Sequence, residues 1–237
     1  MGGGRMKARI AVGLAGAVLA LAGCSPFPMT VASRPLTPVA KGEVRRIAVL
    51  PFTTTGLSTE LTDELGSEPL PEPPGDTVTR AMQTAMREYG DWQIIDDLTV
   101  GEAFRQLYGE VRAPTPEEAV AVGRALRADA VVRGQVKVFD ERIGTELAAK
   151  RPAHVIFAAE LVRMTDGASV WQAEYAEQQQ SLSENLWNLP GFVRAGGTWV
   201  RAGELTQIGA NQMVERLHTT LYGPPPKKPA KTTAKKP

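Results

Sequence analysis

Several kinds of residue are scarce in this chain of 237 amino acids, and each scarcity excludes a class of protein. Cys24 is the only cysteine, so the chain forms no internal disulfide. The two histidines, His154 and His218, leave a zinc site dependent on carboxylates, and we predict no metal and no cofactor. The apolar run at 10–21 is twelve residues long, short of the roughly 20 that cross a bilayer.

Basic residues are also scarce in the part of the chain that is expected to fold. Residues 1–23 hold three positive charges and the segment after Gly223 holds five lysines, which leaves 19 basic and 26 acidic residues between them. This body therefore carries a net charge of about −7, whereas nucleic acid binding requires a basic surface. We predict no nucleic acid partner and find no feature that indicates a small-molecule substrate.

Catalytic motifs are absent from the sequence. There is no Gly-x-Ser-x-Gly elbow, and neither histidine has a partner nearby in the sequence. The adjacent carboxylates of Asp96 and Asp97 point apart, so we expect them to cap the next helix and not to act as an acid–base pair. We predict that the chain is not an enzyme; a hydrolase of cell-wall polymer that uses His154 or His218 is the alternative from this class.

The first 24 residues have the layout of a bacterial secretory signal. Arg5, Lys7 and Arg9 precede the apolar run, and small residues follow it in Leu-Ala-Gly-Cys at 21–24. This ending resembles the lipobox of bacterial lipoproteins. The resemblance implies that residues 1–23 are removed and that Cys24 is acylated, for example with palmitate; the alternative is a small buried cysteine. Ser25 after the cysteine implies, by the same resemblance, anchoring in the outer membrane facing the periplasm.

Three stretches have the composition of connectors. Residues 24–43 contain four prolines and are predicted to be a tether between the lipid and the fold. Residues 56–75 contain five carboxylates and no basic residue, which is typical of a surface loop. Residues 223–237 consist of Gly, Pro, Lys, Thr and Ala and are predicted to be a disordered basic tail.

Residues 44–222 alternate strand and helix patterns and are predicted to be one α/β domain with a mixed sheet, in the order β-α-β-α-α-β-β-β-α. The apolar run at 46–50 is typical of a strand that is buried on both faces. Apolar and polar residues alternate at 132–138, 155–161 and 171–175, which is typical of strands with one buried face. Thr165-Asp166-Gly167-Ala168 predicts a hairpin turn between the last two. Helices are predicted after Asp76 as a cap, after capping boxes at Thr99 and Thr115, and at 201–221. The inner faces of the last three helices are expected to include Leu107, Ala125 and Ile208.

The order of these motifs resembles a known family. The motifs are Arg-Ile-Ala-Val-Leu-Pro-Phe at 46–52, Trp-Gln-Ile-Ile-Asp at 92–96, Ala-Asp-Ala-Val-Val-Arg-Gly-Gln-Val at 128–136 and the hairpin at 161–171. Together they are similar to the periplasmic α/β domain shared by the curli-secretion-channel lipoprotein, the lipoprotein activator of penicillin-binding proteins and the amino-terminal domain of TolB. The resemblance covers about residues 44–221 and implies a non-catalytic role in assembly or partner docking.

An aromatic segment at 182–199 is the candidate interaction surface. Its apolar residues lie among Pro and Gly and are Leu186, Trp187, Leu189, Phe192 and Trp199. Aromatic anchors in loops are enriched at protein interfaces, although this segment can equally fold back over the sheet. We therefore predict a lipid-anchored protein that docks on an envelope protein or assembles with itself; the alternative is an oligomeric subunit of an outer-membrane secretion pore.

Overall fold

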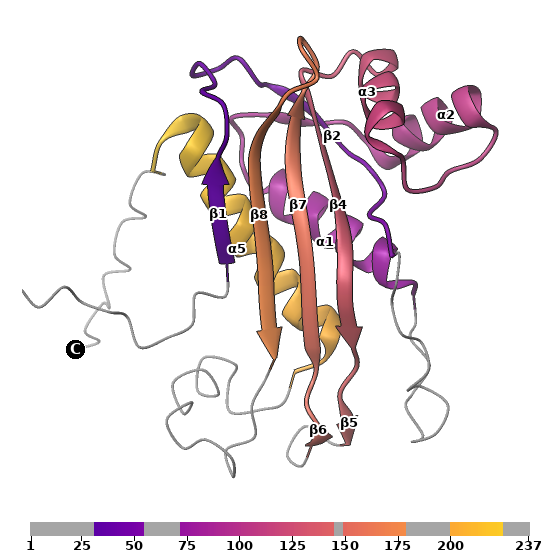
Figure 1. Ribbon diagram of the computed structural model, residues 1–237, viewed down its shortest axis with the longest axis vertical. Coiled ribbons are helices and arrows are strands. Elements are labelled where there is room, and N and C mark those ends of the chain that lie inside the picture. Colours follow the sequence, from indigo (N-terminus) through magenta and orange to yellow (C-terminus); the bar gives the residue numbers. More distant parts are fainter. Residues whose placement is uncertain (1–30, 55–71, 145–148, 179–199, 225–237) are drawn as a thin grey trace, which may run out of the picture.

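A six-stranded mixed sheet organises the residues that the computed structural model describes, which are 31–54, 72–144, 149–178 and 200–224 (Figure 1). The sheet order is β1-β8-β7-β4-β2-β3. Its strands are β1 (Val31–Pro35), β2 (Arg46–Val49), β3 (Gln93–Ile94), β4 (Ala130–Asp140), β7 (His154–Arg163) and β8 (Ser169–Gln178). The described helices are α1 (Pro74–Arg87), α2 (Asp97–Tyr108), α3 (Pro116–Ala125) and α5 (Ala202–Tyr222).

Strand β2 is buried on both faces, as its continuous apolar sequence predicts. It pairs in parallel with β3 and β4, which is the parallel part of the sheet. Ile47 and Val49 face one core cluster, while Ala48 faces the other. The start of β2 is fixed by Asp129, whose carboxylate accepts the backbone N–H groups of Arg45 and Arg46 at 2.9 and 2.8 Å.

The other strands are antiparallel and form the long part of the sheet. Strand β7 pairs with both β4 and β8, and β8 pairs with β1 at the edge. The predicted hairpin turn is confirmed between β7 and β8, where Gly167 adopts φ +72°. At this turn Arg163 donates to Asp166 at 2.6 Å; this bond and the Ala168 N–H lower the pKa of Asp166 to about 2.

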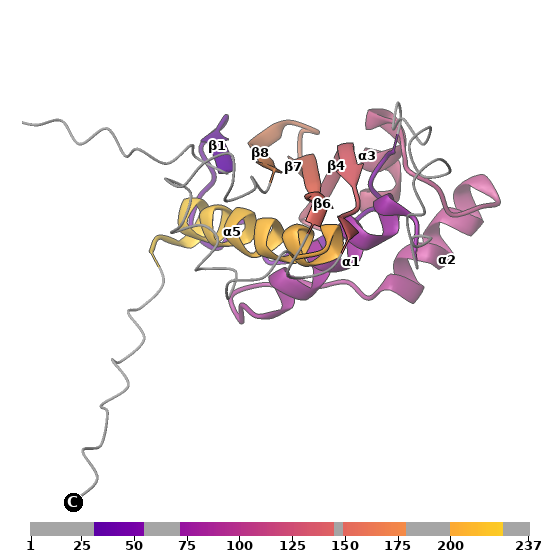
Figure 2. The ribbon, with the colours of Figure 1, turned by 90° about the horizontal axis from the view of Figure 1, so that it is seen from below.

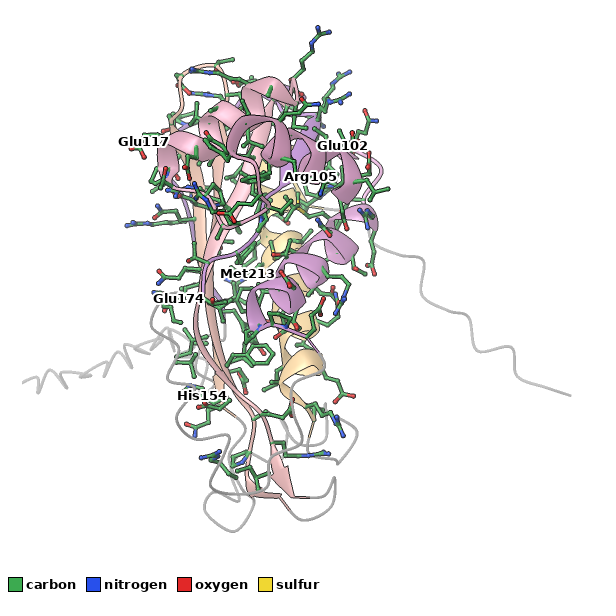
Figure 3. The ribbon with its side chains drawn as sticks, turned by 90° about the vertical axis from the view of Figure 1, so that its right-hand side faces the viewer. Glu102, Arg105, Glu117, His154, Glu174 and Met213 are labelled. Atoms are coloured by element: carbon green, nitrogen blue, oxygen red, sulfur yellow. The ribbon has the colours of Figure 1, made fainter. Side chains whose placement is uncertain are left out.

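The helices cover the two faces of the sheet unequally. Helices α1 and α5 pack side by side on one face, and α2 and α3 lie against one end of the other (Figures 1 and 2). The larger core lies between the sheet and α1 and α5, where Met213 of α5 points toward the strands (Figure 3). Glu174 and His154 project from the opposite side, below α2 and α3. Of the described helices, only α2 and α3 pack on this face of the sheet, at one end, and we call the rest of it the uncovered face.

The predicted order of strands and helices is confirmed, with two additions. Strand β1 lies within the predicted tether of 24–43, so Val31–Pro35 belong to the sheet and not to a connector. The charged segment Phe139–Pro152 contains a second, two-stranded ladder of β5 (Ile143–Gly144) and β6 (Ala149–Arg151). The added strands β1, β5 and β6 are short. Their sequences carry no strand pattern, and they are identified by their pairing with other strands.

Two predicted helix starts are corrected. Helix α1 begins at Pro74 after Pro73, so Asp76 lies in its first turn and is not its cap. Helix α2 is capped by Asp96, whose side chain accepts the Thr99 N–H at 2.9 Å, so the capping box predicted at Thr99 is wrong and the capping role expected of Asp96 is confirmed. Asp96 is the cap because its carboxylate accepts the Thr99 N–H, one of the free N–H groups in the first turn of α2.

The capping box of α3 is confirmed at Thr115 and Glu118. Hydrogen bonds from Arg112 and from the Thr115 N–H lower the pKa of Glu118 to about 2. Because this pKa lies below its ordinary 4.5, the stabilising contribution of Glu118 is complete above pH 4.5 and is lost as the pH falls toward 2.

Among the described helices, none combines the length and the apolar character needed to span a bilayer. The predicted signal at 1–23, the acylated Cys24, the tail beyond Pro224 and the segment 182–199 lie outside the described residues. They stay predictions.

Candidate functional site

The uncovered face of the sheet is hollowed into a trough of about 710 Å³, which we call the sheet trough. Its floor is formed by β1, β8, β7 and β4, and Pro51, Thr53 and Pro114 close it on the side of α2 and α3. The polar side chains that line it are Ser33, Arg34, Thr53, Arg133, Gln135, Lys137, Glu160, Gln172 and Glu174. Its surface is therefore charged, with small residues such as Ala32 and Ala158 between the charges.

Four polar side chains form a continuous row across the trough. Arg133, Glu160, Gln172 and Arg34 stand directly opposite one another on β4, β7, β8 and β1. Arg133 forms an ion pair with one oxygen of Glu160, and Gln172 donates to the other at 3.3 Å. Arg34 donates to the Gln172 carbonyl oxygen at 3.0 Å. The row is held in place because each member is a cross-strand neighbour of the next.

A second contact crosses the trough beside this row. Lys137 of β4 forms an ion pair with Glu174 of β8, and the strand between them carries only the small side chain of Ala158 opposite Glu174. A β-bulge between Val136 and Val138 gives β4 one residue without a register partner, and that residue is Lys137. Both side chains are 45% exposed, so this pair faces solvent.

Gly134 leaves room for the ring of Phe52 against β4. A Cβ atom at this position would lie 2.2 Å from the Ala158 carbonyl oxygen and 2.2 Å from Cε1 of Phe52. The ring of Phe52 therefore lies directly against β4 and packs edge-on against Phe157 at 6.5 Å. The strands beneath the trough rest on a tightly packed aromatic core.

The reactive groups in the described lining of the trough are hydroxyls, carboxylates and cationic side chains. The described residues that line it include the Ser33 and Thr53 hydroxyls but no imidazole and no thiol. Its two acids, Glu160 and Glu174, are both paired with cations.

The two histidines lie at opposite ends of the sheet and are not brought together. His154 is opposite Asp140 at the end of β4, with Nδ1 3.8 Å from the carboxylate. His218 is 4% exposed, and its Nε2 lies 2.7 Å from Asp91 Oδ2. Its ring stacks on Tyr89 at a centroid distance of 4.4 Å. His218 thus has the surroundings of a packed structural residue.

No metal centre is found within residues 31–54, 72–144, 149–178 and 200–224, where no group of three or more His, Cys, Asp or Glu side chains is placed to hold an ion. The predicted interaction residues Leu186, Trp187, Leu189, Phe192 and Trp199, like Cys24, lie outside these ranges. The alternation of polar residues along β4, β7 and β8 pointed to a solvent-facing side, but the trough itself was not predicted from the sequence.

No protein-family model and no curated protein sequence matches the chain. Among solved structures, the chain is similar to the PelC dodecamer from Paraburkholderia phytofirmans, with 15% identity, a TM-score of 0.45 and coverage of 81% of this chain and 98% of that one. It is similar to the LpoB C-terminal domain from Salmonella enterica (16% identity, TM-score 0.39, 60% and 86% covered). Lipoprotein GNA1162 from Neisseria meningitidis gives 16% identity and a TM-score of 0.40, with 64% and 93% covered. These distant likenesses assign the chain to no family, and its function has to be argued from its own residues.

Proposed function

We propose that the chain is a non-catalytic, lipid-anchored protein of the cell envelope whose α/β domain docks on a partner protein through the sheet trough. The lipid on Cys24 would hold the domain at the outer membrane, facing the periplasm. The support for the anchor is the sequence at 1–24, and the support for docking is the uncovered face of the sheet.

The observation that carries the docking proposal is the row from Arg133 to Arg34. Neighbouring strands lie about 4.8 Å apart, so a row across four strands is roughly 14 Å wide. Because its side chains already hold one another, little side-chain freedom is lost when a partner settles on them. An exposed sheet face needs no such arrangement, since single solvated side chains would keep it soluble.

Strand β1 brings the trough close to the proposed anchor. Only residues 25–30 separate Cys24 from Val31, and seven residue steps span at most about 25 Å. Since β1 is the edge strand of the trough floor, a partner bound there would lie near the membrane surface. A partner embedded in or attached to the same membrane fits this placement.

Blocking the trough tests the proposal. Ala32 is exposed, lies on β1 and lines the trough, so Ala32→Trp places a large ring where the partner would settle. The matched control is Asn211→Trp on the exposed side of α5. Treating intact cells with an amine cross-linker should yield a partner adduct that falls about tenfold or more in Ala32→Trp, which corresponds to a loss of about 1.4 kcal/mol or more.

Adducts unchanged in Ala32→Trp, or reduced equally by Asn211→Trp, would remove the trough from the proposal. An adduct whose mass is a multiple of the chain itself would favour the alternative of a self-assembling secretion-pore subunit. Thermal melts of both variants show that each still folds.

A further inference from the structure

The sheet trough contains more hydrogen-bond donors than its own acceptors use. Its cations are Arg34, Arg133 and Lys137, and its anions are Glu160 and Glu174. A guanidinium has five N–H donors and an ammonium has three, and each cation is engaged with one neighbouring side chain of the described trough. Glu160 has both oxygens engaged, one by Arg133 and one by Gln172.

Two of the three cations are exposed and can be reached by a ligand from outside. Arg34 is exposed on the edge strand, and Lys137 is 45% exposed on the other side of the trough. A partner that brings carboxylates would add acceptors for Arg34 and Lys137, whereas a partner that brings cations would meet three cations against two acids in the trough.

We infer that the occupant of the sheet trough is an acidic segment of the partner protein, whose Asp or Glu carboxylates are bound by Arg34 and Lys137. The inference rests on the proposed function and adds to it the chemistry of the partner. Arg34 and Lys137 stand on opposite sides of the trough, so an acidic segment would cross β8 and β7 between them.

The net charge of the chain opposes the binding of an acidic ligand. Between residues 24 and 223 the body carries about −7, so general electrostatics disfavours an acidic ligand. Binding of such a ligand has to come from a local cluster of donors. The sheet trough is a surface where the described residues place three cations around one hollow.

A labelled octaglutamate peptide is the probe, and octaglutamine and octalysine of the same length are its controls. Fluorescence anisotropy at low salt measures the dissociation constant for the full mature chain. In the trough variant, Arg34→Glu and Lys137→Glu are combined; both side chains are exposed, so the fold should persist, which circular dichroism checks. The matched control combines Arg105→Glu and Arg124→Glu, which change the net charge equally on α2 and α3.

We expect the chain to bind octaglutamate and not octaglutamine, with affinity about tenfold or more weaker in the trough variant and within about twofold of the parent in the control. Equal weakening in both variants would overturn the inference, because only net charge would then matter. Preferential binding of octalysine would overturn it as well.

The two proposals fail in distinguishable ways. If octaglutamate does not bind while Ala32→Trp still abolishes the partner adduct, docking through the trough stands and the acidic partner is wrong. If octaglutamate binds at the trough while the yield of the partner adduct is unchanged in Ala32→Trp, the acid-binding site stands and the proposed function is wrong. Self-association of the parent that is lost in the trough variant would make a second copy the occupant and overturn the acidic segment.

Discussion

Replacing Cys24 with serine should move the chain from the membrane fraction to the soluble fraction and abolish incorporation of labelled palmitate. The thiol is the proposed site of acylation, and each methylene buried in the bilayer contributes about 0.8 kcal/mol, so stable anchoring needs more than one acyl chain. None of the described helices offers a second means of spanning the membrane. Fractionation of disrupted cells, with palmitate labelling of the purified chain, measures both effects.

Ser25→Ala is the matched control for this change. It alters the neighbouring residue and leaves the thiol in place, so labelling and membrane association should both persist. Membrane association of Cys24→Ser that survives washing at high salt and high pH would contradict the anchor. A palmitate label that survives the substitution would place the acyl group elsewhere.

Phe157→Ala should lower the free energy of unfolding by about 3–5 kcal/mol, the range typical of a fully buried Phe. The ring is 0% exposed and lies in the larger core, between Phe52 at 6.5 Å and Tyr175 at 5.4 Å. Its removal leaves a cavity beneath the trough, where Gly134 already shows how closely the strands and Phe52 are packed. Urea denaturation followed by circular dichroism measures the change.

Ile156→Ala is the control on the neighbouring residue of the same strand. Ile156 is half-buried on the opposite face of β7, so its truncation should cost only about 1 kcal/mol. Equal losses at the two positions would mean that the face of β7 assigned to the core is wrong. The pair therefore tests the orientation of the strand on which the sheet trough depends.

The sequence predicted those elements whose pattern is strong and local. The apolar run at 46–50 and the alternation in β7 and β8 identify strands because burial on two faces or on one leaves a direct trace in the residues. Strand β1 has no such trace, since Ser33, Arg34 and Pro35 have the composition of a linker. It is a strand because it pairs with β8, about 140 residues further along the chain.

Helix faces were predicted less well than helix positions. Ile208 was expected on the inner face of α5 and is 40% exposed, and Leu107 of α2 is 46% exposed. Ala125 of α3 was also expected inside and is exposed. Ile208 lies on the side of α5 away from its buried residues, whereas Leu107 is on the buried side of α2 but in its last turn, beyond the residues that pack on the sheet.

The sheet trough lay beyond prediction because it depends on long-range register. Alternation indicates that Arg133, Glu160 and Gln172 share a face of the sheet, but not that they stand in one row. That alignment depends on the turn at Gly167 and on the bulge at Lys137. Whether the face is covered depends in turn on where α2 and α3 pack, which the sequence pattern does not specify.

The most direct test of docking through the trough is site-specific photo-crosslinking in intact cells. A benzoylphenylalanine side chain at position 32 lies at the trough, and the same group at position 211 lies on the exposed side of α5. We expect ultraviolet light to produce a discrete adduct with one envelope protein from position 32 and none from position 211. An adduct from position 211 alone, or the same adduct from both positions, would contradict a partner that docks on the uncovered face of the sheet.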